Sequence, residues 1–331
     1  MSHPYIDLHC DSLMMLLSAD AARGTLNDSP YTSVDFKRMA QGGCMAQCFA
    51  IFLPPAELWQ APWFHHAPMT DEAYIAALHG ELTQALALHS DVAALACSAA
   101  DIRKNHAQGK LSAVLTMEDG RAVDGKLENL DRFHGLGIRA LSLTWNAENC
   151  FGAPNSADPA VMARGLTPFG KEAVAYMQHI GILVDVSHLS DGGFWDVAGL
   201  CKKPFIATHS NARALSPHPR NLTDDMLRAI GDAGGVAGLN FGPEFLNADP
   251  ADRRSTAALI AKHARHMANA GGVGVVALGS DLDGIGGELE IGDCSKFPLL
   301  ADAFQAEGFS EDEIDQIYSG NALRAMGDAI G

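Results

Sequence analysis

The amino-acid sequence predicts an α/β fold, a (β/α)8 barrel of the TIM type with extra C-terminal helices, formed by residues 1–331 as a single domain. Eight short apolar runs have the length of strands, and stretches with a helical pattern lie between most of them. Strands that alternate with helices pair in parallel, and eight such units close a barrel. The rival is an open doubly wound sheet, which needs a glycine-rich loop after its first strand. His9-Cys10-Asp11-Ser12 stands there instead.

The expected elements follow one another along the chain. The strand runs are Tyr5–Leu8, Cys44–Phe52, Ser112–Met117, Ile138–Thr144, Ile182–Val186, Phe205–Thr208, Gly235–Asn240 and Val273–Gly279. Apolar residues at helical spacing after polar N-terminal residues predict helices over Thr70–His89, Thr167–Ile180, Asp224–Ala233 and Ser255–Ala270. In the C-terminal tail, Ser310 and Glu313 have the spacing of a capping box, which predicts a helix there.

Composition excludes several classes of partner. Lys and Arg number 23 and Asp and Glu 40, so the formal net charge is −17, which argues against nucleic acid or an anionic membrane as the main partner. No apolar run approaches the ~18 residues of a membrane span, and Met1 to Asp11 carry no basic leader with an apolar segment. The 7 cysteines lack repeated spacing, which is typical of reduced thiols. We therefore expect a cytoplasmic protein.

Polar side chains follow five of the eight strand runs, at the point where each run ends. The first run ends in His9-x-Asp11, and alternation along an extended chain points these two side chains the same way. The others are Glu118, His188, His209 and Asp281. In a barrel these ends share one rim. Such a set of imidazoles and carboxylates suits zinc, and could also hold manganese, iron or cobalt.

Each of these residues also has an ordinary structural explanation. A single His at a strand end is more often a hydrogen-bonded polar group than a ligand, and Asp or Glu at a strand-to-helix turn is often a helix cap. Only their joint occurrence at strand ends favours a metal site. Cys10 lies between His9 and Asp11, and alternation predicts that it points into the barrel wall as a packing residue.

With these motifs the sequence resembles the membrane (renal) dipeptidase family of zinc dipeptidases, within the amidohydrolase superfamily. The resemblance spans nearly the whole chain, and its motifs occur in the family's order. They are Asp7-Leu8-His9-Cys10-Asp11, Met117-Glu118-Asp119-Gly120, Leu141-Ser142-Leu143-Thr144, Gly165-Leu166-Thr167-Pro168-Phe169-Gly170, Val184-Asp185-Val186-Ser187-His188, Thr208-His209-Ser210, Arg220-Asn221-Leu222-Thr223-Asp224-Asp225, Gly279-Ser280-Asp281-Leu282-Asp283-Gly284 and Gly320-Asn321-Ala322-Leu323-Arg324.

The resemblance implies a binuclear-zinc dipeptidase with two zinc ions per chain. His9 and Asp11 would bind one zinc, His188 and His209 the other, and Glu118 would bridge them. A hydroxide between the metals would be the nucleophile. Asp281 would move the proton from water to the leaving amine, and Arg220 would hold the C-terminal carboxylate of the substrate. The substrates would be small dipeptides, including those of the L-Xaa-D-Xaa type. A homodimer would fit the resemblance.

The sequence departs from the family at Trp145. Mammalian members carry a His there, and the resemblance implies that this His stabilises the oxyanion of the tetrahedral intermediate. An indole N–H can donate one hydrogen bond but carries no charge. We also expect no leader, anchor or disulfides of the kind that mammalian members carry, which favours a soluble cytoplasmic form. The loops Leu53–Met69, Trp145–Arg164 and Phe241–Arg254 are expected to form the mouth, and their aromatic residues, including Trp59, Trp63 and Phe64, predict an apolar or aromatic side-chain pocket.

Other functions compete with this interpretation. The same scaffold could hydrolyse an N-acyl amino acid or a lactam, or it could be a non-catalytic metal-binding barrel, although a binder needs no proton carrier such as Asp281. A dehydrogenase is disfavoured because no early strand is followed by a glycine-rich turn. From its position alone, Arg220 would be expected to form a surface salt bridge with Asp224 or Asp225; the resemblance reverses that preference.

Overall fold

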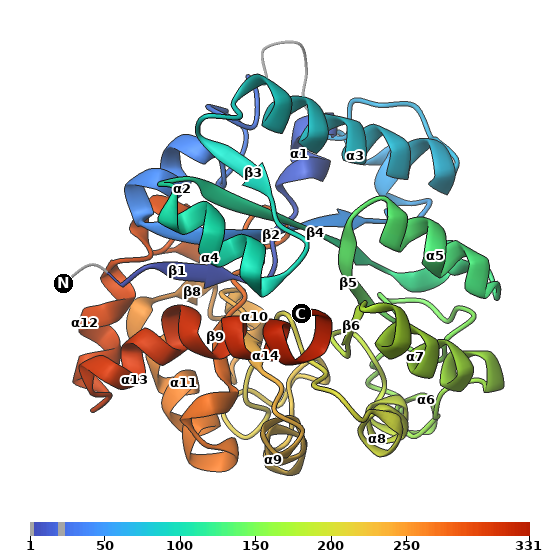
Figure 1. Ribbon diagram of the computed structural model, residues 1–331. Helices are drawn as coiled ribbons and strands as arrows, with labels where there is room; N and C mark the ends of the chain where they lie inside the picture. The colour runs from blue at the N-terminus through green and yellow to red at the C-terminus, as the bar shows by residue number, and fades with distance from the viewer. Residues whose placement is uncertain (1–2, 19–23) are drawn as a thin grey trace.

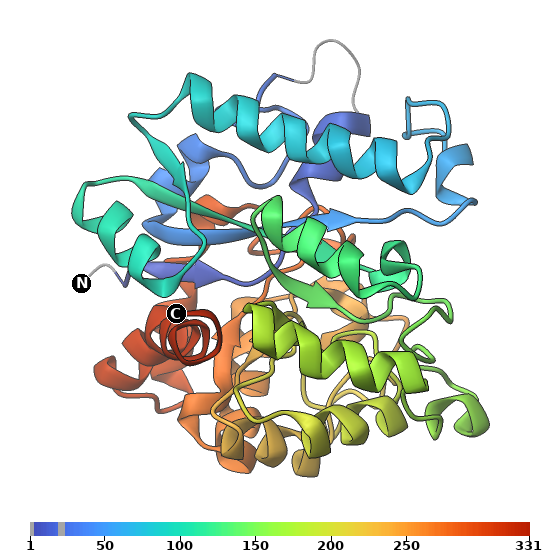
Figure 2. The same ribbon diagram turned by 45° about the vertical axis from the view of Figure 1, so that its right-hand side comes forward.

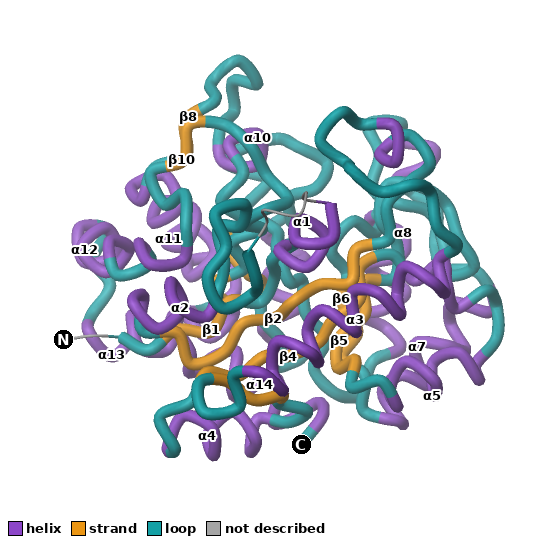
Figure 3. The backbone as a smooth tube through the Cα atoms, turned by 90° about the horizontal axis from the view of Figure 1, so that it is seen from above, coloured by secondary structure: helices purple, strands orange, loops and turns teal. Residues whose placement is uncertain are grey.

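The computed structural model describes residues 3–18 and 24–331. Parallel strands occupy the middle of the molecule and helices surround them (Figures 1 and 3). The strands are β1 (Tyr5–Asp7), β2 (Cys44–Phe52), β3 (Ala93–Leu95), β4 (Leu111–Glu118), β5 (Ile138–Ser142), β6 (Leu183–Asp185), β7 (Ala237–Leu239), β8 (Arg254–Ser255), β9 (Val276–Leu278) and β10 (Glu288–Leu289).

The helices lie mainly between successive strands. They are α1 (Ser12–Ser18), α2 (Phe36–Gly42), α3 (Asp71–Leu88), α4 (Ala99–Ala107), α5 (Leu127–Gly135), α6 (Pro159–Met162), α7 (Pro168–Ile180), α8 (Asp191–Leu200), α9 (Asp224–Asp232), α10 (Pro243–Leu246), α11 (Ala257–Gly271), α12 (Leu299–Ala306), α13 (Glu311–Asp315) and α14 (Asn321–Ile330). Short helical turns are η1 (Leu58–Gln60), η2 (Gly120–Val123), η3 (Val273–Val275), η4 (Cys294–Lys296) and η5 (Gln316–Gly320).

The predicted barrel is confirmed, with one irregular position. Parallel strands follow the order β6-β5-β4-β2-β1-β9-β7. The 205–208 segment joins the two ends of this order through single parallel bridges, from Ile206 to Asp185 of β6 and from Ala207 to Ala237 of β7. The predicted strand Phe205–Thr208 is therefore present as bridges rather than as a regular strand. The reason lies at Thr208, whose backbone N–H donates to the Asp185 carboxylate instead of a backbone carbonyl.

Two glycines let the 205–208 segment come close to its neighbours. A Cβ at Gly238 would lie 1.9 Å from the carbonyl oxygen of Thr208, and one at Gly279 would lie 1.8 Å from the same oxygen. Any side chain at either position would push this backbone outward. His209 follows Thr208 directly, so these glycines also set the position of a candidate site residue.

Most predicted elements are confirmed, with differences at their ends. Thr70, Thr167 and Thr223 cap α3, α7 and α9 with their side chains, and Ser310 and Glu313 form the predicted capping box of α13. The helix predicted from Ser255 begins at Ala257, because Arg254 and Ser255 pair with β10 as β8. The predicted run Val273–Gly279 begins with the turn η3 before β9. Strand β3, which pairs with β4 outside the barrel order, was not predicted.

The apolar interior forms two clusters of buried residues. The smaller cluster contains Ile6, Val114 and Ile206 from different barrel positions, together with Ala322 and Met326 of α14. The C-terminal helix, drawn in red beside β1 in Figures 1 and 2, therefore packs on the barrel's inner layer. The extra C-terminal helices that the sequence predicts are thus part of the core. No helix within the described ranges is both long and apolar enough to cross a bilayer.

His263 ties three parts of the barrel's rim together from the middle of α11. Its Nδ1 accepts from the backbone N–H of Ala212 at 3.2 Å, and its Nε2 donates to the carbonyl oxygen of Leu246 at 3.0 Å. These bonds need a neutral ring with its proton on Nε2. Burial lowers the pKa of His263 to about 4. Ala212 lies three residues after His209, so this contact also supports the site described below.

We predict that His263 makes folding stability depend on pH. Its pKa is lower in the folded chain than its ordinary value of 6.5, so its contribution is complete above pH 6.5 and is lost as the pH falls toward 4. The loss should reach about 3 kcal/mol. Urea unfolding of the wild type and His263→Gln between pH 4 and pH 7.5 measures this, and the variant should show the smaller decrease. Equal decreases in both proteins would contradict the prediction.

Candidate active site

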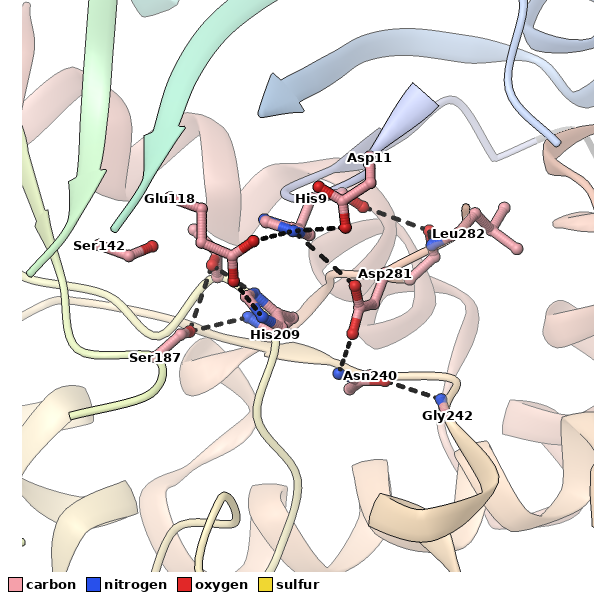
Figure 4. Close-up of polar contacts among 12 residues, drawn as sticks. His9, Asp11, Glu118, Ser142, Ser187, His209, Asn240, Gly242, Asp281 and Leu282 are labelled. Atoms are coloured by element: carbon pink, nitrogen blue, oxygen red, sulfur yellow. Dashed lines mark hydrogen bonds and ion pairs between the residues drawn. The ribbon is translucent and has the colours of Figure 1, made fainter. Parts of the chain in front are cut away.

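The structure brings the predicted site residues to one end of the barrel. His9 and Asp11 follow β1, Glu118 ends β4, and Asp281 follows β9. His209 follows the 205–208 segment, and His188 follows β6 by three residues. Figure 4 shows the side chains of five of them pointing toward one another, with the Glu118 carboxylate facing both His9 and His209. The rings of His9 and His209 stack, with their centroids 3.9 Å apart. All six side chains are buried.

Two of the imidazoles face one oxygen of Glu118. Nε2 of His188 lies 2.9 Å and Nε2 of His209 lies 3.4 Å from Oε1 of Glu118. The two Nε2 atoms are 3.0 Å apart. The other carboxylate oxygen, Oε2, lies 3.6 Å from Nε2 of His9. Glu118 thus has a different histidine environment on each of its two oxygens.

The second half of the cluster surrounds His9. Its Nε2 lies 3.7 Å from Oδ2 of Asp11 and 3.8 Å from Oδ1 of Asp281. Ligand atoms of His9, Glu118 and His209 lie within 4.8 Å of one another, and so do those of His9, Asp11 and Asp281. Nε2 of His9 and Oδ1 of Asp11 are buried without a hydrogen-bond partner among residues 3–18 and 24–331. Buried nitrogen and oxygen atoms that lack a hydrogen-bond partner are available as ligands, so this set fits a metal ion.

The charges of the cluster also favour a cation. Burial lowers the pKa of His188 and of His209 and raises the pKa of Glu118. Burial likewise raises the pKa of Asp281 to about 7. Burial alone would lower the pKa of His9, but Glu118, Asp11 and Asp281 outweigh it and raise that pKa to about 10. Asp11, Glu118 and Asp281 thus favour a positive charge beside them, which a divalent cation can supply.

A buried carboxylate sets the tautomer of His209. Thr208 Oγ1 donates to Oδ2 of Asp185 at 2.6 Å and lies 2.7 Å from Nδ1 of His209. Since the Thr208 hydroxyl has one proton, which goes to Asp185, Nδ1 of His209 is the donor in the second bond. Nε2 of His209 is then left with its lone pair toward Glu118. Asn146 acts similarly on His188, because its Oδ1 lies 3.1 Å from Nδ1 of that ring.

Sequence reasoning missed these supporting residues, although two left a signal. Asp185 and Asp7 are charged residues inside apolar runs, where a carboxylate needs several donors. Asp7 accepts from the backbone N–H of Ser280 at 2.7 Å and from its hydroxyl at 2.6 Å, directly before Asp281. Asn240 donates to Oδ2 of Asp281 at 2.8 Å, which leaves Oδ1 toward His9.

The backbone is strained at two of the site residues. His188 has φ 67° and Asp281 has φ 62°, in the left-handed region that side chains other than glycine rarely adopt. Such strain persists where the surrounding structure imposes it, and it is typical of functional sites. Each of these residues lies in a turn after a strand, and its left-handed backbone directs the side chain into the cluster.

A cavity of about 460 Å³ opens over the cluster, with an acidic floor and an apolar mouth. Each of the three predicted mouth loops contributes to it, through Trp63, Trp145 and Phe245. Trp59 instead lines a second cavity, and Phe64 is buried against Trp59 and Trp63. Cys10 lies in the main apolar cluster, as alternation predicts. The aromatic mouth is thus present, with Trp63 rather than Trp59 or Phe64 facing the site.

Arg220 lies behind the cluster. Its Nη1 donates to Oγ of Ser210 at 2.9 Å and its Nη2 to the carbonyl oxygen of His209 at 3.1 Å. Its Nε is buried with no hydrogen-bond partner in the described part of the chain. Asp224 is paired with His266 and Asp225 with Arg228, so the surface salt bridge that position alone suggested is not formed.

Comparison with known proteins agrees with this geometry. The sequence profile of the membrane dipeptidase family (peptidase family M19) matches residues 1–330. The chain belongs to this family. It is a peptide-bond hydrolase, a dipeptidase, which excludes the non-catalytic barrel and the dehydrogenase. The family consists of metallopeptidases, and the buried set of His, Asp and Glu side chains fits the metal that membership implies.

Relatives within and around the family cover almost the whole chain. Dipeptidase aclJ of Aspergillus oryzae is 32% identical over 311 residues, which are 93% of this chain and 72% of the relative. A metallo peptidase from Rhodobacter sphaeroides, solved with a phosphinate mimic of the dipeptide L-Ala-D-Ala, is 30% identical with a TM-score of 0.89 and covers 99% of this chain and 100% of that chain. The dipeptidase AC of family M19 has 32% identity and a TM-score of 0.86, with coverage of 99% and 100%.

We predict that the Thr208 hydroxyl strengthens metal binding in this metallodipeptidase. Thr208→Val removes the hydroxyl between Asp185 and His209 without changing side-chain shape, and metal affinity should fall about 10- to 100-fold. Competition with a chromophoric chelator measures it. Thr116→Val on β4 is the matched control, since its buried hydroxyl has no partner within the described residues and its loss should leave the affinity unchanged. Equal affinities in both variants would contradict the prediction.

Proposed function

We propose that this chain is a binuclear-zinc dipeptidase that hydrolyses the peptide bond of small dipeptides, including L-Xaa-D-Xaa substrates. One observation carries the proposal: His9, Asp11, Glu118, His188, His209 and Asp281 form one buried cluster below a cavity of about 460 Å³. The similar Rhodobacter sphaeroides enzyme, solved with a mimic of L-Ala-D-Ala, supports the choice of substrate.

Five residues would hold the metal ions. His9 and Asp11 would bind one and His188 and His209 the other, with Glu118 between them. The two oxygens of Glu118 support this division, because Oε2 is nearer to His9 and Oε1 lies between the rings of His188 and His209. Zinc accepts this mixture of imidazole and carboxylate ligands. When bound, the ions would supply Lewis-acid activation of water and of the scissile carbonyl.

Asp281 would carry the proton. Amide hydrolysis needs a base that takes a proton from the attacking water and an acid that gives one to the leaving amine. Asn240 holds one oxygen of Asp281, and the other faces His9 and the cavity. Burial raises the pKa of Asp281 to about 7 and a neighbouring cation would lower it, so the carboxyl would be ionised near neutral pH and able to accept a proton.

Arg220 would bind the C-terminal carboxylate of the dipeptide. A guanidinium offers two parallel N–H groups to a carboxylate, and Nε of Arg220 is still unpaired. The hydrogen bonds to Ser210 and to the carbonyl oxygen of His209 hold the guanidinium beside the cluster. A substrate that is short and anionic at one end would then place its peptide bond over Glu118.

The first test combines metal content with a substrate panel. Purified protein should contain about two zinc ions per chain by elemental analysis. It should cleave L-L and L-D dipeptides, and a chelator should abolish cleavage until zinc or manganese is restored. Two bound metals without dipeptide cleavage would refute the substrate and point to N-acyl amino acids or lactams. Failure to bind metal even after reconstitution would refute the ligand set.

We predict that Asp281→Asn lowers kcat by about 10²- to 10⁴-fold, because the amide cannot accept the proton of water. The new side-chain amide keeps the hydrogen bond from Asn240 only if it turns its oxygen toward Nδ2 of Asn240. KM and zinc content should therefore be measured together with kcat, and KM and zinc content should change little. Asp283→Asn, two residues along the same cavity wall, is the matched control and should lose less than about ten-fold. Activity of Asp281→Asn within ten-fold of wild type would refute the proton-carrying role.

We predict that Arg220→Met raises KM for dipeptides about 30-fold or more, since truncating one partner of a buried charge pair costs about 2 kcal/mol or more. Dipeptide amides, which lack the terminal carboxylate, should be unaffected by the change. Arg213→Met, which breaks a pair with Asp191 nearby, is the matched control and should keep the preference for acids over amides. Retention of that preference in Arg220→Met would assign the carboxylate to another group.

A further inference from the structure

A second cavity, of about 640 Å³, lies next to the catalytic cavity. The two share Trp145 and Asn146 in their linings. The Trp145 ring packs edge-on against Phe52, with ring centroids 4.9 Å apart, and its centroid lies 6.1 Å from that of His188. Thr144 Oγ1, one residue earlier, donates to the carbonyl oxygen of His188 at 3.0 Å. The indole is thus a fixed wall between the two cavities.

This wall stands at a defined end of the substrate. In the order of the barrel, β2 and β4 lie across the mouth from the 205–208 segment and β7. Arg220 belongs to the loop between that segment and β7, whereas Phe52 ends β2 and Trp145 follows β5, beside β4. A dipeptide with its carboxylate at Arg220 would therefore extend across the cluster toward Phe52 and Trp145. Its amino end would then face the indole, which packs against Phe52.

The second cavity has the chemistry of a site for an additional N-terminal residue. Its walls are largely apolar, from Pro54, Pro55, Trp59, Pro68 and Met69. Its volume is in the range that encloses small ligands. The lining also holds the carboxylates of Glu57, Asp71, Asp119 and Glu148 against the single cation Arg121. An apolar residue with a free ammonium group is complementary to such a surface.

Arg121 does not make this cavity attractive to anions. Its Nε and Nη2 donate to Asp71 at 2.9 and 2.8 Å, and its Nη1 donates to Asp119 at 3.0 Å and to the carbonyl oxygen of Leu53 at 2.8 Å. The guanidinium is thus engaged by two carboxylates. The lining keeps a negative balance, with Glu148 partly offset by its exposed pair with Arg164.

We propose that Trp145 restricts this enzyme to dipeptides by closing the catalytic cavity against the second cavity; this rests on the proposed function. Removing the indole joins the two cavities and admits a tripeptide. Water then cleaves the C-terminal peptide bond of that tripeptide. The carbonyl carbon gains the hydroxyl group and the nitrogen gains the proton, and the products are a dipeptide and a free amino acid. Trp145 is thereby a specificity-determining residue.

The test compares L-Ala-D-Ala with L-Ala-L-Ala-D-Ala. For Trp145→Ala, the ratio of kcat/KM for the tripeptide to kcat/KM for the dipeptide should rise about ten-fold or more, the usual range for added space in a pocket. The ratio removes any effect of Trp145 on the chemical step, which both substrates share. Trp195→Ala on α8 is the matched control, since that indole is exposed and lines neither cavity, and its ratio should stay at the wild-type value.

Two further variants make the result specific. Ala147→Trp, which fills the second cavity, should reverse the gain when added to Trp145→Ala. Trp145→Leu should give a smaller gain, and it replaces Trp145→Ala if the latter loses its metal or unfolds. An unchanged ratio in a folded, metal-loaded variant overturns the proposal, and so does a wild type that cleaves both peptides equally well. A wild type that cleaves neither overturns the proposed function as well, which separates the two failures.

Discussion

Burial of three carboxylates beside three imidazoles is the constraint on which the rest of the structure depends. Asp11, Glu118 and Asp281 lie together out of water, where unpaired negative charge is strongly destabilising. These carboxylates raise the pKa of His9, so the cluster favours a positive charge. A bound metal would supply that charge. The cluster therefore makes sense as a metal centre, and its assembly requires strands whose carboxyl ends meet at one rim.

The same rim is held by buried carboxylates beneath it. Asp185 accepts from Ser142, from the backbone N–H of Ser187 and from Thr208, and so joins β5, β6 and the 205–208 segment under the two histidines. Asp7 joins β1 to β9 through Ser280 in the same way. These bonds explain why the 205–208 segment is not a regular strand. Its backbone bonds to Asp185, which supports His209, instead of completing the hydrogen-bond ladder of the sheet.

Much of the fold and of the site was predictable because both follow from local pattern. Apolar runs of strand length, each ending in His, Asp or Glu, show where the barrel ends and which side chains gather there. Strand β3 was not predictable in the same way: Ala93–Leu95 is three residues of small or ordinary apolar character, and its pairing with β4 is a long-range event. The roles of Asn146 and Asn240 could not be predicted either. Each amide orients a site residue, His188 or Asp281, only through a contact between distant segments.

The sequence by itself determined the barrel and the family and predicted a set of residues for a metal site, because periodicity and strand-end chemistry are properties of neighbouring positions along the chain. Only the tertiary structure decided how these residues act together. The two faces of Glu118, the tautomer of His209 and the recessed place of Arg220 arise from distances between segments far apart in sequence. The position of Trp145 between two cavities is of the same kind, because the residues that line both cavities come from segments far apart in sequence.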